Sequence, residues 1–258
     1  MRLYWKFFLM HIKSQMQHKA SFLMLTIGQF LVSFSAFLGI DFMFSRFNVV
    51  NGFTFAQVLL CFAIMLMAFS TAEIFGRGFD VFPQMLGNGE FDRALVRPRN
   101  IVFQVLASKM EFTRIGRFSQ AALVLLYAVP NSGVDWTPDK ILTMILMIVC
   151  GAFVFFGLFL IYAAISFFTI EGLEFMNIFT DGGREFGKYP FSVYGDKILK
   201  FLTYVIPLAL FQYWPLLYLL GRTDNKMYMF LPVAALVFLI PCYGFFRLGL
   251  RHYKSTGS

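Results

Sequence analysis

Long apolar runs separated by short polar segments dominate the sequence. A membrane-spanning helix needs roughly 20 predominantly apolar residues. Six runs approach or exceed that length, and they are 20–40, 47–72, 118–134, 141–170, 201–221 and 227–246. The run 118–134 is the shortest and contains Pro130, whereas 141–170 is long enough to tilt. None alternates polar and apolar residues in a sustained way, so the pattern predicts a bundle of six transmembrane helices.

Basic residues lie mainly in alternate polar segments. The N-terminal segment, the loops 77–117 and 171–200 and the tail 247–258 hold most of the 22 Lys and Arg. The opposite loops hold only Arg46, Lys140, Arg222 and Lys226. By the positive-inside rule, both termini and the two larger loops are predicted to be cytoplasmic.

The first 19 residues suit an amphipathic helix. On a helix, one face carries the apolar side chains Trp5, Phe8, Leu9, Ile12 and Met16, with basic residues beside it. This pattern predicts a helix that lies in the cytoplasmic interface and leads into the first span. The alternative is a cytoplasmic extension of that span. His11 and His18 are expected on the surface of this helix rather than in a metal site.

Composition supports the membrane assignment. Hydrophobic residues make up 59% of the chain and charged residues only 14%, with a mean hydropathy of +0.69. Soluble domains are less apolar and carry about 25% charged residues. The net charge of +8 follows from the topology and does not indicate nucleic acid. The three cysteines lie in apolar runs, so we expect buried thiols and neither disulfides nor zinc.

Several functional classes lack their sequence signatures here. The chain has no GxxxxGK[ST] phosphate loop and no cluster of Ser, His and acidic residues, so no catalytic residue, cofactor site or metal site is predicted. Proton-driven transporters usually carry acids near the middle of the membrane. The acids closest to the spans, Asp41, Glu73, Glu171 and Glu174, are expected at span ends instead. We therefore expect the energy for transport to come from another chain.

Four stretches resemble a known transporter family. They are "GEFDRALVRPRNIVFQVLASKMEFTRIGR" (89–117), "ISFFTIEGLEFMNIFTDGGREFGKYP" (165–190), "LTYVIPLALFQYWP" (202–215) and "FRLGLRHYKSTGS" (246–258). With the predicted topology, they resemble the membrane subunits of ABC type-2 (ABC-2) exporters, and in particular a bacterial group of standalone ABC-2 permeases.

The resemblance implies an all-α membrane protein with the ABC-2 (type V exporter-like) permease fold, in the bacterial cytoplasmic membrane. Such permeases pair with a second copy or a related permease. Two separate ATPase chains, which bind ATP and Mg²⁺, drive them through short coupling helices. Many also have a re-entrant hairpin before the last span, but only 221–226 separates the last two runs here. Pro207 and Pro215 indicate either a shortened re-entrant turn or two ordinary kinks.

A polar island, "GNGEFDRALVRPRN" (87–100), follows the second run. The sequence "EFDRALVR" predicts two helical turns, with acids at the start, arginines toward the end and Pro98 as a stop. Apolar anchors among charges suit a groove on a partner protein. The residues predicted to couple to the ATPase are Glu90, Phe91, Asp92, Arg93, Leu95 and Arg97. The alternative is a solvated loop whose arginines bind anionic lipid.

Two further groups of residues are candidates for function. In the second loop, Glu171, Glu174, Arg184 and Glu185 are expected to pair with the first loop or to touch the ATPase. Polar and aromatic residues within the spans are candidates for the substrate path, and they are Gln29, Ser33, Ser35, Gln57, Gln212, Tyr213 and Trp214. Such residues also bond between helices of one subunit. Abundant Phe and Met suit hydrophobic or amphipathic cargo.

The sequence thus predicts the permease subunit of an ABC exporter, which has no enzymatic activity of its own. Two other classes stay open. One is a proton-coupled secondary transporter, and the other is a membrane scaffold or immunity protein that binds without transporting.

Overall fold

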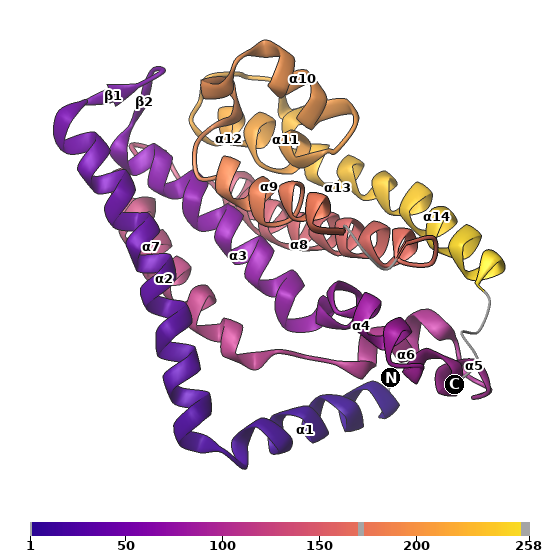
Figure 1. The fold of residues 1–258 in the computed structure, drawn as a ribbon. Coiled ribbons are helices and arrows are strands. Elements are labelled where there is room, and N and C mark those ends of the chain that lie inside the picture. Colours follow the sequence, from indigo (N-terminus) through magenta and orange to yellow (C-terminus); the bar gives the residue numbers. More distant parts are fainter. Residues whose placement is uncertain (1, 170–172, 254–258) are drawn as a thin grey trace.

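Most of the described chain is helical (Figure 1). The computed structural model describes residues 2–169 and 173–253. In order, the elements are α1 (Arg2–Met16), α2 (Lys19–Arg46), β1 (Val49–Val50), β2 (Phe53–Thr54), α3 (Phe55–Asp80), α4 (Phe82–Gly87), α5 (Glu90–Leu95), α6 (Ile101–Ser108), η1 (Phe112–Arg114), α7 (Ile115–Asn131), α8 (Pro138–Ile165), η2 (Leu173–Ile178), α9 (Asp181–Phe186), η3 (Phe191–Tyr194), α10 (Asp196–Tyr204), α11 (Leu208–Phe211), α12 (Tyr213–Leu219), η4 (Lys226–Phe230), α13 (Leu231–Ala235), η5 (Leu236–Phe238) and α14 (Leu239–His252).

The bundle has two distinct ends. At one, which we call the hairpin end, the antiparallel pair β1 and β2 joins α2 to α3 and aligns Val50 with Phe53. The other, which we call the α1 end, holds α1 and α4 to α6. Both ends of the described chain lie at the α1 end (Figure 1). The predicted placement of both termini on one side is consistent with this arrangement, and the membrane side that they face stays a prediction.

Within the described residues, four helical stretches are long and apolar enough to cross a membrane. They are Lys19–Arg46, Phe55–Gly87, Pro138–Ile165 and Lys226–His252, and they correspond to the predicted spans 20–40, 47–72, 141–170 and 227–246. The second starts later than predicted, because residues 49–54 form the hairpin. The predicted span 118–134 corresponds to α7, a helix of 17 residues that packs along α2 and α3.

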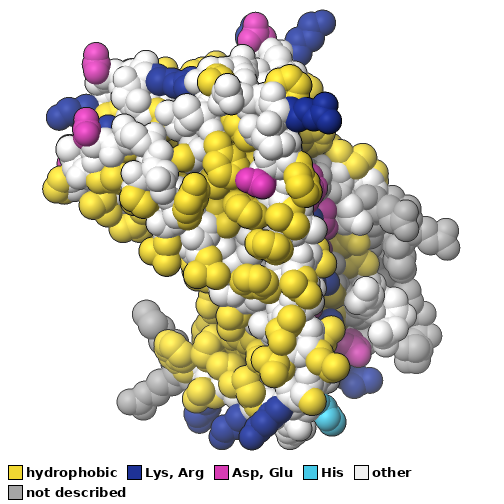
Figure 2. Space-filling model, turned by 90° about the vertical axis from the view of Figure 1, so that its left-hand side faces the viewer, with side chains coloured by type: hydrophobic (Ala, Val, Ile, Leu, Met, Phe, Trp, Pro, Cys, Tyr) yellow, Lys and Arg dark blue, Asp and Glu magenta, His cyan; other side chains and the backbone are white. Residues whose placement is uncertain are grey.

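Helix α3 is the centre of the fold. Its apolar window is 83% buried, whereas that of α2 is only 11% buried. A helix that is apolar all round packs best when other helices surround it. Phe69 of α3 meets the rings of Phe155 and Phe159 of α8 at centroid distances of 5.0 and 6.2 Å. On the face around α2, hydrophobic side chains spread over the middle, while most Lys and Arg lie near its upper and lower ends (Figure 2).

The predicted fifth span, 201–221, is a bent pair of helical stretches. Helix α10 ends at Tyr204, and the helical stretch Leu208–Leu219 follows at an angle of 87°. Pro207 lies at the bend, where its missing amide hydrogen removes a helical hydrogen bond. The indole of Trp214 donates a hydrogen bond to Thr203 Oγ1 at 3.2 Å, which holds the two arms together. The sharp bend lies at Pro207, whereas Pro215 lies within α12, so the two prolines do not make two equivalent kinks.

The predicted cytoplasmic loop 171–200, in its described part, does not stay at the α1 end beside the other predicted cytoplasmic loop. Cys61, in the hairpin-side half of α3, lies 3.7 Å from the carbonyl oxygen of Gly187. Ser192 then accepts a hydrogen bond from Asn51, in the turn between β1 and β2, at 3.3 Å. The segment therefore runs along α3 and reaches the hairpin end. Its charges suggested a loop in water, but Arg184 and Lys188 pair with Glu185 inside the segment.

Candidate functional site

Helix α5 forms where the polar island predicts it. Gly89 precedes it with a φ of 68°, a left-handed conformation that glycine adopts without strain. Glu90 and Asp92 lie in the first turn, where carboxylates interact favourably with the helix dipole. The helix ends at Leu95, so it is two residues shorter than the predicted "EFDRALVR".

Phe91 is the internal anchor of α5. Its side chain is 0% exposed, and its ring meets Phe82, Phe167 and Tyr253 edge-on at centroid distances of 5.0, 5.6 and 5.1 Å. Its predicted role as an anchor in a partner's groove is therefore wrong. Phe167 and Tyr253 lie just beyond the ends of α8 and α14, far away in the sequence, so no local pattern around Phe91 indicates this burial.

The C-terminal end of α5 is an exposed apolar tip. Leu95 is 39% exposed and Val96 is 83% exposed. Arg93, Arg97 and Arg99 are exposed around them. We call these five residues the α5 tip. Sequence reasoning missed Val96, although its place between two arginines and before Pro98 was a usable signal.

A cleft separates the α5 tip from α1 and α6. It has a volume of about 400 Å³, and its lining includes Phe7, Glu90, Arg93, Arg97 and Phe103. Gln104 of α6 also lines the cleft, and its side-chain amide donates to the carbonyl oxygens of Ala94 and Arg99 at 3.0 and 3.1 Å. The tip is therefore held on a defined scaffold.

Helix α1 is tied to the same segment. His11 Nε2 lies 2.9 Å from the carbonyl oxygen of Ala107, and the Gln15 side chain donates to the Met110 carbonyl at 2.7 Å. Phe8 packs edge-on against Phe112 at 5.1 Å. Part of the predicted apolar face of α1 thus packs on the protein, while Trp5, Leu9 and Met16 stay exposed.

A buried ion cluster joins the two ends of the loop 77–117. Glu73, which is 3% exposed, lies 2.7 Å from Arg117 Nη1 and 3.2 Å from Arg114 Nε. Arg77 Nε lies 2.8 Å from Glu111 and also pairs with Asp80. A buried charge requires such partners, because its desolvation is costly. Sequence reasoning missed this cluster, and it links the last turns of α3 to the start of α7.

The comparison with known families decides the identity. The family model described as ABC-2 family transporter protein matches residues 30–257. The chain belongs to the ABC-2 transporter family. No curated protein and no solved structure shows a significant match. The chain is therefore a multi-pass membrane permease, a component of an ABC transporter that associates with ABC ATPase subunits and is not itself the ATPase.

The second predicted group of charges in this permease is only partly described. Glu171 lies outside the described residues, and the side chain of Glu174 is not described either. Arg184 Nη2 lies 2.9 Å from Glu185 and 3.4 Å from Asp181. These ion pairs join residues of one segment. The sequence predicts that this group either pairs with the first loop or touches the ATPase.

The predicted path residues of the permease do not converge. Gln57 accepts from the Thr54 amide at 3.3 Å and from Arg222, at the hairpin end. Gln212 is fully buried and donates to the carbonyls of Gly187 and Tyr189 at 3.1 and 3.3 Å. Most of the predicted path residues are hydrogen-bonded within the chain or buried. The predicted residues are Gln29, Ser33, Ser35, Gln57, Gln212, Tyr213 and Trp214.

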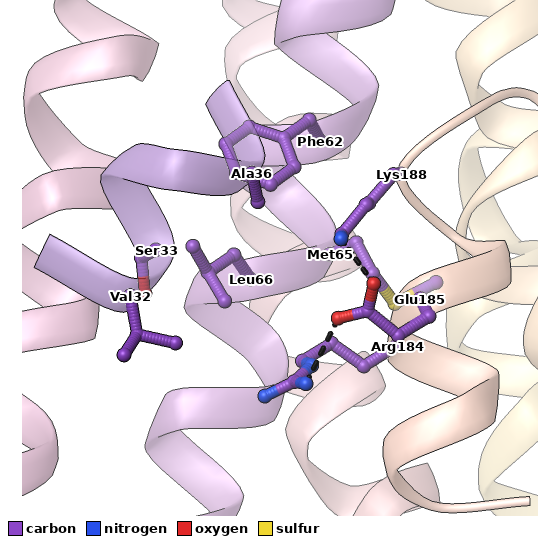
Figure 3. A pocket seen from close by; sticks show the side chains of 9 residues that line it. All are labelled: Val32, Ser33, Ala36, Phe62, Met65, Leu66, Arg184, Glu185 and Lys188. Atoms are coloured by element: carbon purple, nitrogen blue, oxygen red, sulfur yellow. Dashed lines mark hydrogen bonds and ion pairs between the residues drawn. The ribbon is translucent and has the colours of Figure 1, made fainter. Parts of the chain in front are cut away.

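Ser33 differs from the rest because it lines a small cavity. Ser33 lies on α2 and faces α3 and the segment after η2 (Figure 3). Three charged side chains of that segment, Arg184, Glu185 and Lys188, form the other wall. This member of the predicted path set thus lies beside charged groups in a cavity.

Proposed function

We propose that this permease is the membrane subunit of an ATP-driven exporter, in which the α5 tip binds the ATPase and receives its motion. The observation that carries the proposal is the contrast between the buried start of α5 and its exposed C-terminal end. Phe91 anchors the first turn within the bundle, whereas Leu95 and the following Val96 are exposed among exposed arginines. Exposed apolar residues with a polar rim are typical of a protein interaction site.

The complete exporter would contain two ATPase chains, which bind ATP and Mg²⁺, and a second copy of this chain or a related permease. The α1 end would face the cytoplasm of a bacterial cell. The concentration of Lys and Arg in 1–19 and 77–117 supports that orientation. The low burial of α2 supports a second subunit, because a large face of this helix has no partner within the described chain.

Motion of the α5 tip has two rigid routes into the bundle. Through Phe91 it reaches the residues that follow α8 and α14, which are Phe167 and Tyr253. Through the Glu73 cluster, the ends of the loop 77–117 are held on α3 and α7. Nucleotide binding on the ATPase would then shift the balance between two arrangements of the spans.

The cargo in this proposal is hydrophobic or amphipathic. An almost wholly apolar cavity of about 480 Å³ lies between α1, α3, α6, α7 and α8, and its lining includes Phe75, Phe118, Phe153 and Phe156. Aromatic and aliphatic linings of this size suit apolar ligands.

Copurification and transport together test the proposal. Tagged permease isolated from its own cells should retain an ABC ATPase, and its presence in nanodiscs should change the rate of Mg-ATP hydrolysis. Inverted membrane vesicles should accumulate a lipophilic dye with ATP, and a protonophore should leave that accumulation unchanged. Accumulation that a protonophore abolishes would favour a proton-coupled transporter. Permease that neither retains the ATPase nor alters its turnover would favour a scaffold.

A further inference from the structure

The small cavity beside Ser33 has one apolar wall and one charged wall. Helices α2 and α3 provide the apolar wall, which consists of Val32, Ala36, Phe62, Met65 and Leu66 (Figure 3). Arg184, Glu185 and Lys188 provide the charged wall. The volume of about 30 Å³ is enough for about one water molecule in this conformation. A two-sided lining of this kind matches a ligand that is itself amphipathic.

The charged wall lies at the depth of the membrane core. Phe62, Met65 and Leu66 follow the start of α3 by about two to three helical turns, which is roughly 10 to 17 Å along a helix of this rise. The guanidinium of Arg184 lies 5.0 Å from the centroid of Phe69, one turn deeper. Charged side chains at this depth face a bundle interior or a water-filled path rather than lipid.

The exposure of the acidic side chains distinguishes a closed bundle interior from a water-filled path. The side chains of Asp181 and Glu185 are 55% and 48% exposed, whereas those of Arg184 and Lys188 are 15% and 19% exposed. Half-exposed carboxylates beside an apolar span would be very unfavourable in lipid. This face of α9 is therefore in contact with water or a second subunit, as a wall of the transport path would be.

Arg184 and Lys188 have more N–H donors than the carboxylate of Glu185 accepts hydrogen bonds from. Arginine and lysine together carry eight N–H donors. Glu185 accepts hydrogen bonds from both Arg184 and Lys188, yet Arg184 Nε is buried without a hydrogen-bond acceptor. The guanidinium of Arg184 also lies over the ring of Phe69, 5.0 Å from its centroid. Its fork of N–H donors matches pairs of oxygens on a carboxylate or a phosphate.

We propose that Arg184 and Lys188 form a head-group site in the transport path, which binds the anionic group of an amphipathic cargo. The apolar part of the cargo would rest on Val32, Ala36 and Leu66. Glu185 occupies the cations when no cargo is bound, and the incoming anion displaces it. The inference rests on the proposed transport function and narrows its substrate class to amphiphiles that carry a carboxylate, phosphate or sulfate.

Binding measurements without any ATPase test this site. Permease in phosphatidylcholine nanodiscs is titrated calorimetrically with decyl phosphate and with decyltrimethylammonium as the cationic counterpart. Empty nanodiscs provide the background. We expect saturable binding of decyl phosphate and no saturable binding of decyltrimethylammonium. Arg184→Gln and Lys188→Gln should each weaken it about tenfold or more, since each removes a charge-assisted hydrogen bond.

Glu185→Gln gives the sharper result, because it removes the competing carboxylate and should tighten decyl phosphate binding. Lys200→Gln, an exposed lysine of α10, is the matched control and should leave binding unchanged. Size-exclusion profiles show whether each variant folds, and the Glu185→Gln result stands even if the Arg184 variant does not. Binding that ignores Arg184, Lys188 and Glu185, or no saturable binding, overturns the proposal.

A second arm separates cargo from bilayer lipid, since both carry phosphate. The titration is repeated in nanodiscs that also contain phosphatidylglycerol. Unchanged binding of decyl phosphate supports a cargo site, whereas its loss shows that lipid occupies the cations and overturns the cargo assignment. Failure here would leave ATPase coupling at the α5 tip intact, so the two proposals fail separately.

Discussion

The phenol of Tyr253 donates a hydrogen bond to the carboxylate of Asp92, with 3.0 Å between the two oxygens. The two residues are 161 positions apart, and the bond fastens the end of α14 to α5. Burial raises the pKa of the Tyr253 phenol, and the hydrogen bond to Asp92 raises it further. The phenol therefore keeps its proton, and the donor is present throughout the neutral pH range.

Tyr253→Phe removes this bond and keeps the ring on Phe91. The free energy of unfolding should fall by about 1 to 2 kcal/mol, as for a hydrogen bond to a charged group that is partly exposed. Denaturant titration in detergent measures the change. Tyr243→Phe, at an exposed tyrosine of α14, is the control and should have little effect. Equal effects of the two variants would show that the bond to Asp92 contributes nothing.

Phe91→Ala should be far more destabilising than Leu95→Ala, although both lie on α5. Phe91 is fully buried among aromatic rings, and truncation of such a residue costs about 3 to 5 kcal/mol. Leu95 is 39% exposed and should lose much less. Thermal unfolding of the two purified variants makes the comparison. Similar stabilities would contradict the assignment of Phe91 as the internal anchor.

Much of the bundle was predictable because α2, α3 and α8 are continuous apolar runs whose length alone indicates a span. The beginning of α5 was predictable for a local reason, since Gly89 and two acids precede the arginines. Pro207 correctly marked the break in the predicted fifth span, although the angle between its arms depends on packing that a sequence does not display.

The errors have one physical origin, which is contact between residues far apart in the sequence. Phe91 looked like a partner anchor because its neighbours Phe167 and Tyr253 come much later in the chain. Arg184 looked like a loop charge because Phe69 of α3, against which its guanidinium lies, comes 115 positions earlier in the chain. Counts of charge and hydropathy treat each residue alone, so they do not detect contacts between distant residues.

The Glu73 cluster predicts a measurable coupling energy between two side chains. Glu73→Gln alone leaves Arg117 without its 2.7 Å partner and should cost about 3 kcal/mol. The double variant, Glu73→Gln with Arg117→Gln, should lose less unfolding free energy than the two single variants added together. Each single variant already loses the same ion pair, and the double variant loses it only once. Unfolding free energies of the wild type, both single variants and the double variant give the cycle. Strict additivity would mean that the pair does not interact.

Gly116 predicts a close approach between α7 and α2. A Cβ there would overlap the carbonyl oxygen of Thr26, which is backbone and cannot swing away. Gly116→Ala should therefore separate the helices and lower the melting temperature. Gly28→Ala, on the facing helix, meets nothing within 4 Å and should be neutral or slightly stabilising. Equal tolerance of the two changes would contradict the packing of α2 on α7.

The most direct test of the central claim is Mg-ATP hydrolysis by the partner ATPase in complex with permease variants. Leu95→Asp with Val96→Asp places two charges on the α5 tip without touching Phe91. Gln84→Asp with Asn88→Asp places two charges on exposed positions of the neighbouring α4 segment. We predict that the tip variant stays folded and loses ATPase binding and its effect on turnover, while the α4 variant behaves as wild type. Unchanged binding and turnover in the tip variant would contradict the account.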